Sequence, residues 1–225
     1  MFSIDANRVL RSAVLADLDW LDHGFQTRVS DYLPKDFRIA GVKQIHTDRV
    51  LVAGADTGIL GEADALVSHT PGTLLTIKTA DCVPILIVDP LQQAVAAVHA
   101  GWRGTVAGIV LRAVDTLARE FRSEPRNLLI AVGPCIRKDA FEVGPDVAFQ
   151  FQGLFPDRHD LGERTTVDLV EACSRQLVSA GVPASAILDC GRCSFSEPAS
   201  FHSFRRDRQE AGRMLSFVGV RGANP

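Results

Sequence analysis

The pattern of apolar positions along the chain predicts a series of buried strands. Continuous apolar runs of strand length, closed by turn residues, are typical of strands that are buried on both faces of a sheet. Runs of this kind, together with two late apolar segments, predict strands at Thr73–Ile77, Val83–Val88, Ala94–His99, Asn127–Val132, Ala186–Asp189 and Met214–Val220.

Two other segments have the three-to-four-residue spacing of an amphipathic helix. Apolar residues recur at this spacing between Thr105 and Phe121, which predicts a helix with Thr105 as its N-cap. A second helix is expected over Val167–Ala180, where Gly181 would end it. Because strands occur both in clusters and alternating with helices, we expect an α/β (α+β) fold with mixed β-sheets and flanking helices.

Length and composition indicate one soluble domain over residues 1–225. Hydrophobic residues make up 46% and charged residues 23% of the chain, which are ordinary values for a globular protein. The net charge of −3 argues against a nucleic-acid partner, because phosphate contacts require a basic surface. No apolar stretch is long enough to span a membrane, and five irregularly spaced cysteines favour reduced thiols in a cytoplasmic protein.

The segment VHAGWRGT, from Val98 to Thr105, contains several candidate functional residues close together. An apolar run delivers His99 to its end, and two glycines then bracket Trp102 and Arg103. The two glycines let a ligand approach the backbone closely, and a cation at such a position can bind an anion. Arg103 is therefore a candidate anion-binding residue. Trp102 could stack on a flat ligand, although a core tryptophan is an equally good reading.

Two further segments add metal ligands to this set. KTADCVP places Asp81 and Cys82 beside an apolar run, and KQIH ends in His46. Imidazole and thiolate groups bind zinc and copper, and a catalytic zinc site keeps three protein ligands and one open position. Residue types alone favour His46 as a surface loop residue, and leave Cys82 and His99 open between metal ligands and core residues.

Other readings of the polar residues stay open. Cys82 and His99 could form a nucleophile–base pair, and Asp81 could orient a ligand, transfer protons or simply cap a turn. Cys190 and Cys193 have metal or redox spacing, but a structural zinc site needs a second ligand pair, so two reduced thiols are expected there. The remaining histidines in polar stretches are expected to be solvated, namely His23, His69 and His159.

Taken in order along the chain, these motifs resemble the YfiH family, which is also labelled multicopper polyphenol oxidase, laccase domain and purine nucleoside phosphorylase. The pieces TADC–P and HAGWRG are together highly specific, and the others follow in family order over nearly the whole chain. They are HGFQTR from His23, KQIHTDRV from Lys43, EADALVS from Glu62, TADCVPILIVDP from Thr79, AVHAGWRGT from Ala97, VGPCI from Val132, FEVG from Phe141, VDL from Val167, SFRRD from Ser203 and GRM from Gly212.

The resemblance implies a mixed α/β fold and a zinc-bearing cleft with His46, Cys82 and His99 as the metal ligands. It also implies cleavage of purine nucleosides by phosphate, with adenosine deamination and methylthioadenosine phosphorolysis as associated activities. The older label implies copper-dependent oxidation of phenols. The chain departs from the family pattern in a short segment between Arg28 and Lys43, and in SFRRDR where the family has SYRRDG.

The residues favour the phosphorylase over the oxidase. A multicopper centre needs more ligands than this chain offers, since it has six histidines with no His-x-His pair and two methionines. One copper held by His46, Cys82 and His99 could still oxidise phenols weakly. Phosphate needs cations and amide donors, which Arg103, the expected helix start at Gly104–Thr105, and Arg205 or Arg206 would supply. We therefore expect Asp81, Cys82, Arg103 and Arg205 to be catalytic, zinc (or copper) to be the cofactor, and a purine nucleoside and phosphate to be the partners.

A non-catalytic, metal-stabilised binding module is the remaining hypothesis. A structural zinc site is closed by four protein ligands, and the sequence offers three strong candidates. A ligand or water in a fourth position would distinguish an enzyme from such a module. The sequence leaves the oligomeric state open.

Overall fold

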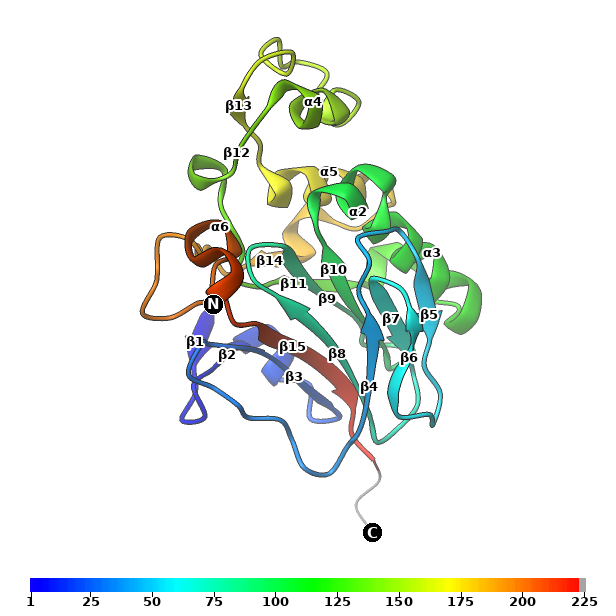
Figure 1. The fold of residues 1–225 in the computed structure, drawn as a ribbon. Helices are drawn as coiled ribbons and strands as arrows, with labels where there is room; N and C mark the ends of the chain where they lie inside the picture. Colours follow the sequence, from blue (N-terminus) through cyan, green and yellow to red (C-terminus); the bar gives the residue numbers. More distant parts are fainter. Residues whose placement is uncertain (223–225) are drawn as a thin grey trace.

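Two β-sheets stacked face to face form the centre of the computed structural model, which describes residues 1–222 (Figure 1). The larger sheet has seven strands in the order β1-β2-β3-β15-β8-β4-β6. Their bounds are Phe2–Ile4, Val9–Ser12, Leu21–Gln26, Met214–Val220, Thr73–Thr79, Arg38–Lys43 and Gly58–Glu62 in that order.

The second sheet has six strands in the order β14-β11-β9-β10-β7-β5. Their bounds are Ile187–Asp189, Leu129–Val132, Val83–Asp89, Ala94–Ala100, Ala65–Ser68 and Val50–Val52 in that order. Each sheet mixes parallel pairs, such as β4 with β8 and β5 with β7, with antiparallel ones. The expected mixed sheets are therefore confirmed, and β9 and β10 are buried at every position, as their apolar runs predicted.

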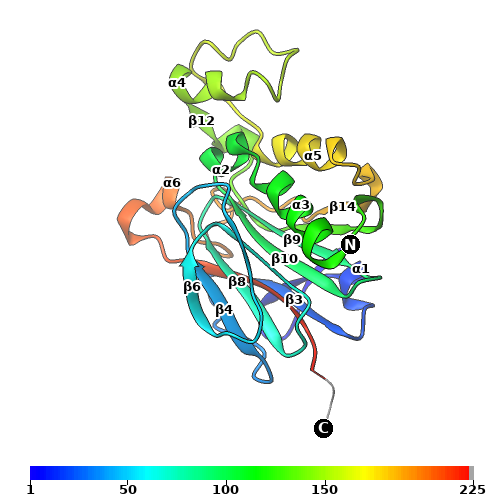
Figure 2. The same ribbon diagram turned by 90° about the vertical axis from the view of Figure 1, so that its right-hand side faces the viewer.

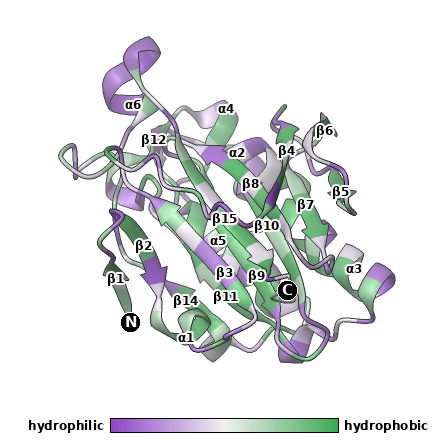
Figure 3. Cartoon of the chain, turned by 90° about the horizontal axis from the view of Figure 1, so that it is seen from below, coloured by the Kyte–Doolittle hydropathy of each residue, from purple (hydrophilic) through white to green (hydrophobic). Residues whose placement is uncertain are grey.

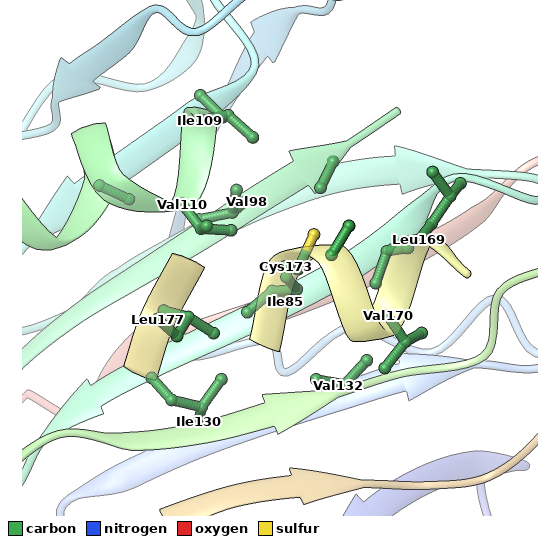
Figure 4. Close-up of a cluster of buried hydrophobic side chains, with 14 of the residues drawn as sticks. Ile85, Val98, Ile109, Val110, Ile130, Val132, Leu169, Val170, Cys173 and Leu177 are labelled. Atoms are coloured by element: carbon green, nitrogen blue, oxygen red, sulfur yellow. The ribbon is translucent and has the colours of Figure 1, made fainter. Parts of the chain in front are cut away.

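Hydrophobic side chains fill the space between the sheets and the space between the second sheet and its helices. Between the sheets, one cluster joins residues such as Leu75 and Ile77 of β8 to Leu86 of β9. A second cluster packs the other face of β9, β10 and β11 against α3 (Ile109–Phe121) and α5 (Leu169–Ser179), as Figure 4 shows. Seen from below, the central strands are coloured as hydrophobic and α6 (Phe204–Asp207) as hydrophilic (Figure 3).

The helix expected over Thr105–Phe121 is divided in two and begins earlier. A short helix, α2, spans Trp102–Ala107, and α3 follows it after Gly108. Gly108 has φ of +85°, a left-handed conformation that ends α2 and that glycine adopts without steric cost. The N-cap of α2 is Gly101, so Thr105 as N-cap is wrong: its amide donates to Gly101 O, and the residue is fully buried.

The second expected helix is confirmed as α5. Its N-cap is Asp168, whose carboxylate accepts the N–H of Glu171 at 2.9 Å. Gly181 follows the helix with φ of +96°, as its place after the helix predicted. The remaining elements within residues 1–222 are short: α1 (Ala13–Ala16), β12 (Glu142–Val143), α4 (Pro145–Ala148), β13 (Thr165–Thr166) and five 3₁₀ turns.

Several short elements lie at the end of the sheets that carries the site described below. Figures 1 and 2 both place α2 and α6 at the same end of the two sheets, with α4, β12 and β13 standing beyond them. In the part of the chain that the structure describes, no helix is long and apolar enough to cross a membrane.

Candidate metal centre

His46, Cys82 and His99 converge at one end of the sheets. Each offers one ligand atom, and these atoms all lie within 4.8 Å of one another. The rings of His46 and His99 meet edge to face, with centroids 4.9 Å apart. His99 is buried, Cys82 is half-buried and His46 is exposed, so the group opens to solvent on the His46 side.

The strand pairing explains how residues so distant in sequence meet. Antiparallel pairing of β9 with β10 sets Ala100 opposite Val83, which brings His99 beside Cys82, the residue that precedes β9. His46 lies in the segment that follows β4, and the side chain of Gln44 fixes this segment against β8. The Gln44 amide donates to Lys78 O and accepts from Lys78 N, both at 2.8 Å, so it replaces a missing pair of sheet hydrogen bonds.

Asp64 is the residue that links two of the three ligands. Its carboxylate is fully buried and accepts hydrogen bonds from Nδ1 of His99 at 2.8 Å and from the main-chain N–H of His46 at 3.0 Å. It also accepts from the N–H of Thr47 at 2.6 Å. Because Asp64 engages Nδ1 of His99, Nε2 of that ring is left to face a metal.

The electrostatics of the trio follow from these contacts. Burial disfavours a charged His99, but the hydrogen bonds that its ring donates to Asp64 and Cys82 prevail and raise the pKa of His99 to about 9. Burial also opposes ionisation of Asp64, yet its hydrogen bonds to His99 and Thr47 lower its pKa to about 2. In the metal-free site these directions pair the Asp64 carboxylate with a protonated His99, so a bound metal would have to displace the proton on Nε2.

The pKa of His46, in contrast to that of His99, is lowered. Burial, the neighbouring His99, and the positive charges of Arg103 and Arg213 lower the pKa of His46. Asp64 opposes this shift without reversing it. A neutral imidazole is the form that binds a metal.

Backbone geometry at the trio is unusual in two places. His46 has φ of +60° and Asp81 has φ of +86°, a left-handed region that non-glycine residues rarely occupy. Gly101 lies against the ligands, because a Cβ added there would stand 2.7 Å from Nδ1 of His46 and 3.1 Å from Sγ of Cys82. The site thus requires glycine at this position for space, while its φ of −73° is ordinary.

The trio fits a tetrahedral metal with one position left for a ligand. Two imidazoles and one thiolate suit zinc or copper, and donors in a tetrahedral zinc site stand roughly 3.3 to 3.7 Å apart. The ligand atoms, all within 4.8 Å of one another, are close enough for one ion to be bound by all three once the side chains draw in around it. Within residues 1–222 the ligand group contains these three residues, which leaves a fourth position open.

Asp81 lies next to Cys82, but its carboxylate is directed at other partners. One oxygen accepts the hydroxyl of Ser194 and the other accepts the main-chain N–H of Arg205, each at 2.6 Å. Asp81 thereby ties the turn that carries Cys82 to α6. Asp81 therefore adjoins the ligand group through Cys82, and its carboxylate holds the surrounding segments together.

Arg103 is exposed at the start of α2 and stacks on Trp102, with its guanidinium carbon 4.3 Å from the ring centroid. The prediction that a helix starts at Gly104–Thr105 and binds an anion there is wrong. Thr105 lies inside α2, and its amide donates to Gly101 O. Gly104 is needed for packing instead: a Cβ there would lie 2.9 Å from Thr47 O.

Arg205 and Arg206 have structural partners. Arg205 donates to Glu142 O at 2.8 Å and stacks on Phe141, with its guanidinium carbon 5.3 Å from the ring. Arg206 pairs with Asp207 and donates to three main-chain carbonyls, those of Ser194, Phe195 and Phe201. Arg206 therefore holds the segment before α6 in place, which argues against its use as a phosphate clamp.

The structure confirms some of the other expectations for histidine and cysteine residues and contradicts one of them. His69 and His159 are exposed as expected, but His23 is buried, and its Nε2 accepts the N–H of Ser12 at 3.0 Å. The expectation that His23 is solvated is therefore wrong. Cys190 and Cys193 are free thiols, one half-buried and one buried, as expected.

The fold and site define an α/β protein with a solvent-accessible imidazole–thiolate–imidazole metal centre. The comparisons identify its family. Residues 26–221 match the family described as multi-copper polyphenol oxidoreductase laccase, and the chain belongs to that family. The resemblance stated from the motifs is thereby confirmed.

Relatives and solved structures agree with this membership. A purine nucleoside phosphorylase of Deinococcus radiodurans is 40% identical over 188 residues, which cover 80% of this chain and 70% of that protein. The adenosine deaminase RL5 of an unknown prokaryotic organism is 38% identical over 178 residues, or 76% of this chain and 67% of that protein. The crystal structure of YlmD from Geobacillus stearothermophilus superposes with a TM-score of 0.88 at 28% identity and 98% coverage of both chains.

Proposed function

We propose that this protein is a zinc-dependent purine nucleoside phosphorylase acting on adenosine, inosine or methylthioadenosine. The observation that carries the proposal is the three-ligand group of His46, Cys82 and His99, which is buried on one side and open on the other. Relatives named purine nucleoside phosphorylase, at 35% to 40% identity, support the substrate class.

His46, Cys82 and His99 would hold the zinc ion. A bound zinc ion would supply Lewis-acid chemistry that polarises an oxygen of phosphate or water. Copper is the alternative metal, because the same donors bind it strongly. Asp64 would fix the ring of His99 and keep the loop of His46 in position through its buried carboxylate.

The chain's own residues would then orient the reactants. In phosphorolysis, a phosphate oxygen forms a bond to C1′ of the ribose, and the bond from C1′ to the base nitrogen breaks. The electron pair of that bond leaves with the purine, which needs a proton or an equivalent hydrogen bond. We assign phosphate binding to Arg103, and proton transfer or ligand orientation to Asp81.

Adenosine deamination is a second candidate, because one relative carries that name. In that reaction water adds to C6 of the purine and ammonia leaves. The chain lacks the H-x-E and P-C-x-x-C signature of the zinc deaminases that act on nucleobases, so deamination here would use the His46, Cys82 and His99 arrangement.

Two other hypotheses are less well supported. A multicopper oxidase needs several copper sites, whereas residues 1–222 provide one ligand group of the required kind. A purely structural metal site would be closed by a fourth protein ligand, and the exposed side of His46 argues against closure.

The test is incubation of zinc-loaded protein with adenosine, inosine and methylthioadenosine, each with and without phosphate. Phosphorolysis yields the free base and ribose 1-phosphate only when phosphate is present, whereas deamination yields inosine from adenosine in its absence. His99→Ala should abolish both activities and bound zinc. His69→Ala, which alters an exposed histidine stacked on Phe121 instead, is the matched control. Absence of any base release by the wild type would refute the phosphorylase.

A further inference from the structure

Three arginines near the metal centre form no ion pair with a carboxylate, and each stacks on an aromatic ring. Arg103 lies 4.3 Å from the ring of Trp102, Arg205 lies 5.3 Å from Phe141, and Arg213 lies 5.8 Å from Phe204. None of the ion pairs in the described part of the chain includes these three arginines. Unneutralised guanidinium groups around a metal centre are a feature of anion sites.

The strand register places Arg213 beside the ligands. The antiparallel pairing of β15 with β8 sets Met214 opposite Thr79 at the end of the ladder. Arg213 precedes β15 by one residue, so it stands where β8 turns toward Asp81 and Cys82.

A second contact places Arg213 on the same side of the site as α6. Phe204, on which Arg213 stacks, is the first residue of α6, and the next residue donates its N–H to Asp81. Arg213 therefore lies beside the segment that Asp81 ties to the turn of Cys82, whereas Arg103 comes from the start of α2.

The local contacts of Arg213 leave most of its donors available. Its Nη1 donates to Ala211 O at 2.8 Å and to Gly212 O at 3.0 Å, and the side chain is exposed. Gly212 packs directly against His202, where an added Cβ would lie 2.5 Å from the ring, so the backbone before Arg213 is held in place. Arg205, by contrast, is committed to Glu142 O.

We propose that Arg213 is the second phosphate-binding cation of the site and holds the anion opposite Arg103. The inference rests on the proposed phosphorylase function and names a residue that carries its phosphate specificity. A guanidinium offers paired donors that match two oxygens of one phosphate, and two such groups match the charge of the dianion. Phe204 supports the stacked guanidinium and limits its rotation.

The test compares Arg213→Gln and Arg213→Lys with the wild type as zinc-loaded proteins. Arg213→Gln should raise KM for phosphate by about 10- to 100-fold, because charged hydrogen bonds are lost. KM for inosine and the zinc content should change little. Arg213→Lys should recover part of the affinity, since it keeps the charge but loses the paired donors. Calorimetric titration of the same proteins with inorganic phosphate measures binding without any turnover.

Arg38→Gln is the matched control. Arg38 is exposed, donates to the main-chain carbonyl of Pro71 and begins β4, whereas His46 follows the other end of that strand. Unchanged phosphate binding by Arg213→Gln would overturn the inference, and so would loss of zinc from that variant, which would mean a structural role. If the wild type binds phosphate through Arg213 but releases no base, the inference stands and the phosphorylase proposal fails.

Discussion

The carboxylate of Asp64 lies 2.8 Å from Nδ1 of His99, and the same oxygen accepts the main-chain N–H of His46 at 3.0 Å. One fully buried acid thus positions two ligands that are 53 residues apart in sequence. Such a contact fixes which nitrogen of His99 faces the metal and strengthens that nitrogen as a donor. Asp64 consequently contributes to the metal centre without belonging to the ligand group.

Asp64→Asn should weaken zinc binding by about 10- to 100-fold, because the amide loses the charge that orients and polarises His99. Competition with a chromogenic chelator measures the affinity, and circular dichroism checks the fold. Asp89→Asn is the control, since Asp89 is equally buried but accepts the N–H groups of Leu91 and Gln92. Equal zinc affinity in both variants would remove Asp64 from the centre.

Gly101→Ala should lower zinc affinity by about tenfold or more while the fold is retained. The new Cβ would stand 2.7 Å from Nδ1 of His46, and metal–ligand distances tolerate errors of only about 0.2 Å. The backbone conformation of Gly101 suits alanine, so the effect isolates the steric contact. Gly153→Ala, which meets nothing within 4 Å, should bind zinc like the wild type. Normal zinc content in Gly101→Ala would show that the ligands can move aside.

The sequence predicted those parts of the fold whose burial is uniform. Strands β8, β9, β10 and β15 are buried at most or all positions, so their apolar runs are continuous. Most strands before β8 were not predicted because their exposure is irregular or their residues are polar, whereas β7 is apolar and buried but only four residues long. Strand β3 reads LDHGFQ yet is buried throughout, since its polar groups find partners on β2.

The site was predictable to the extent that its residues are chemically distinctive. His46, Cys82 and His99 are metal-ligand types in specific motifs, and the structure brings their ligand atoms together. Asp64 was missed because a carboxylate in EADALVS looks like any other until its strand pairing is known.

Arg103→Ala should raise KM for phosphate by about 10- to 100-fold while zinc content stays constant. The exposed guanidinium is held on Trp102, so its removal takes away a preoriented charge without opening the core. Initial rates at varied phosphate and fixed inosine give the constant, and elemental analysis gives the zinc. An unchanged phosphate dependence would exclude Arg103 from the site.

Asp81→Asn should lower kcat by about 10²- to 10⁴-fold if the carboxylate moves a proton. Asparagine can still accept the N–H of Arg205 through its Oδ1, and its amide can donate to the hydroxyl of Ser194, so the turn that carries Cys82 should keep its shape. Zinc content therefore serves as the internal control. A loss of less than about fivefold would leave Asp81 a positioning role only, and Ser194→Ala should then have a similar effect.

His23 should make the free energy of unfolding depend on pH between about 6.5 and 4. Burial and the nearby charge of Arg11 lower the pKa of His23 to about 4, which outweighs the opposing effects of Asp22 and Ser12. The unfolded chain, with an ordinary pKa near 6.5, thus binds more protons than the folded chain in this range. Stability is fully present above pH 6.5 and decreases as the pH falls, by about 3 kcal/mol at pH 4.

Urea unfolding at several pH values would test this for the wild type and for His23→Gln, whose neutral oxygen can still accept the N–H of Ser12. The variant is expected to be less stable at neutral pH, but its stability should fall less steeply on acidification, so that the two curves converge toward pH 4. His159→Gln changes an exposed histidine and should retain the steep wild-type dependence. Parallel curves for the wild type and His23→Gln would mean that His23 takes up its proton in the folded protein as readily as in the unfolded chain.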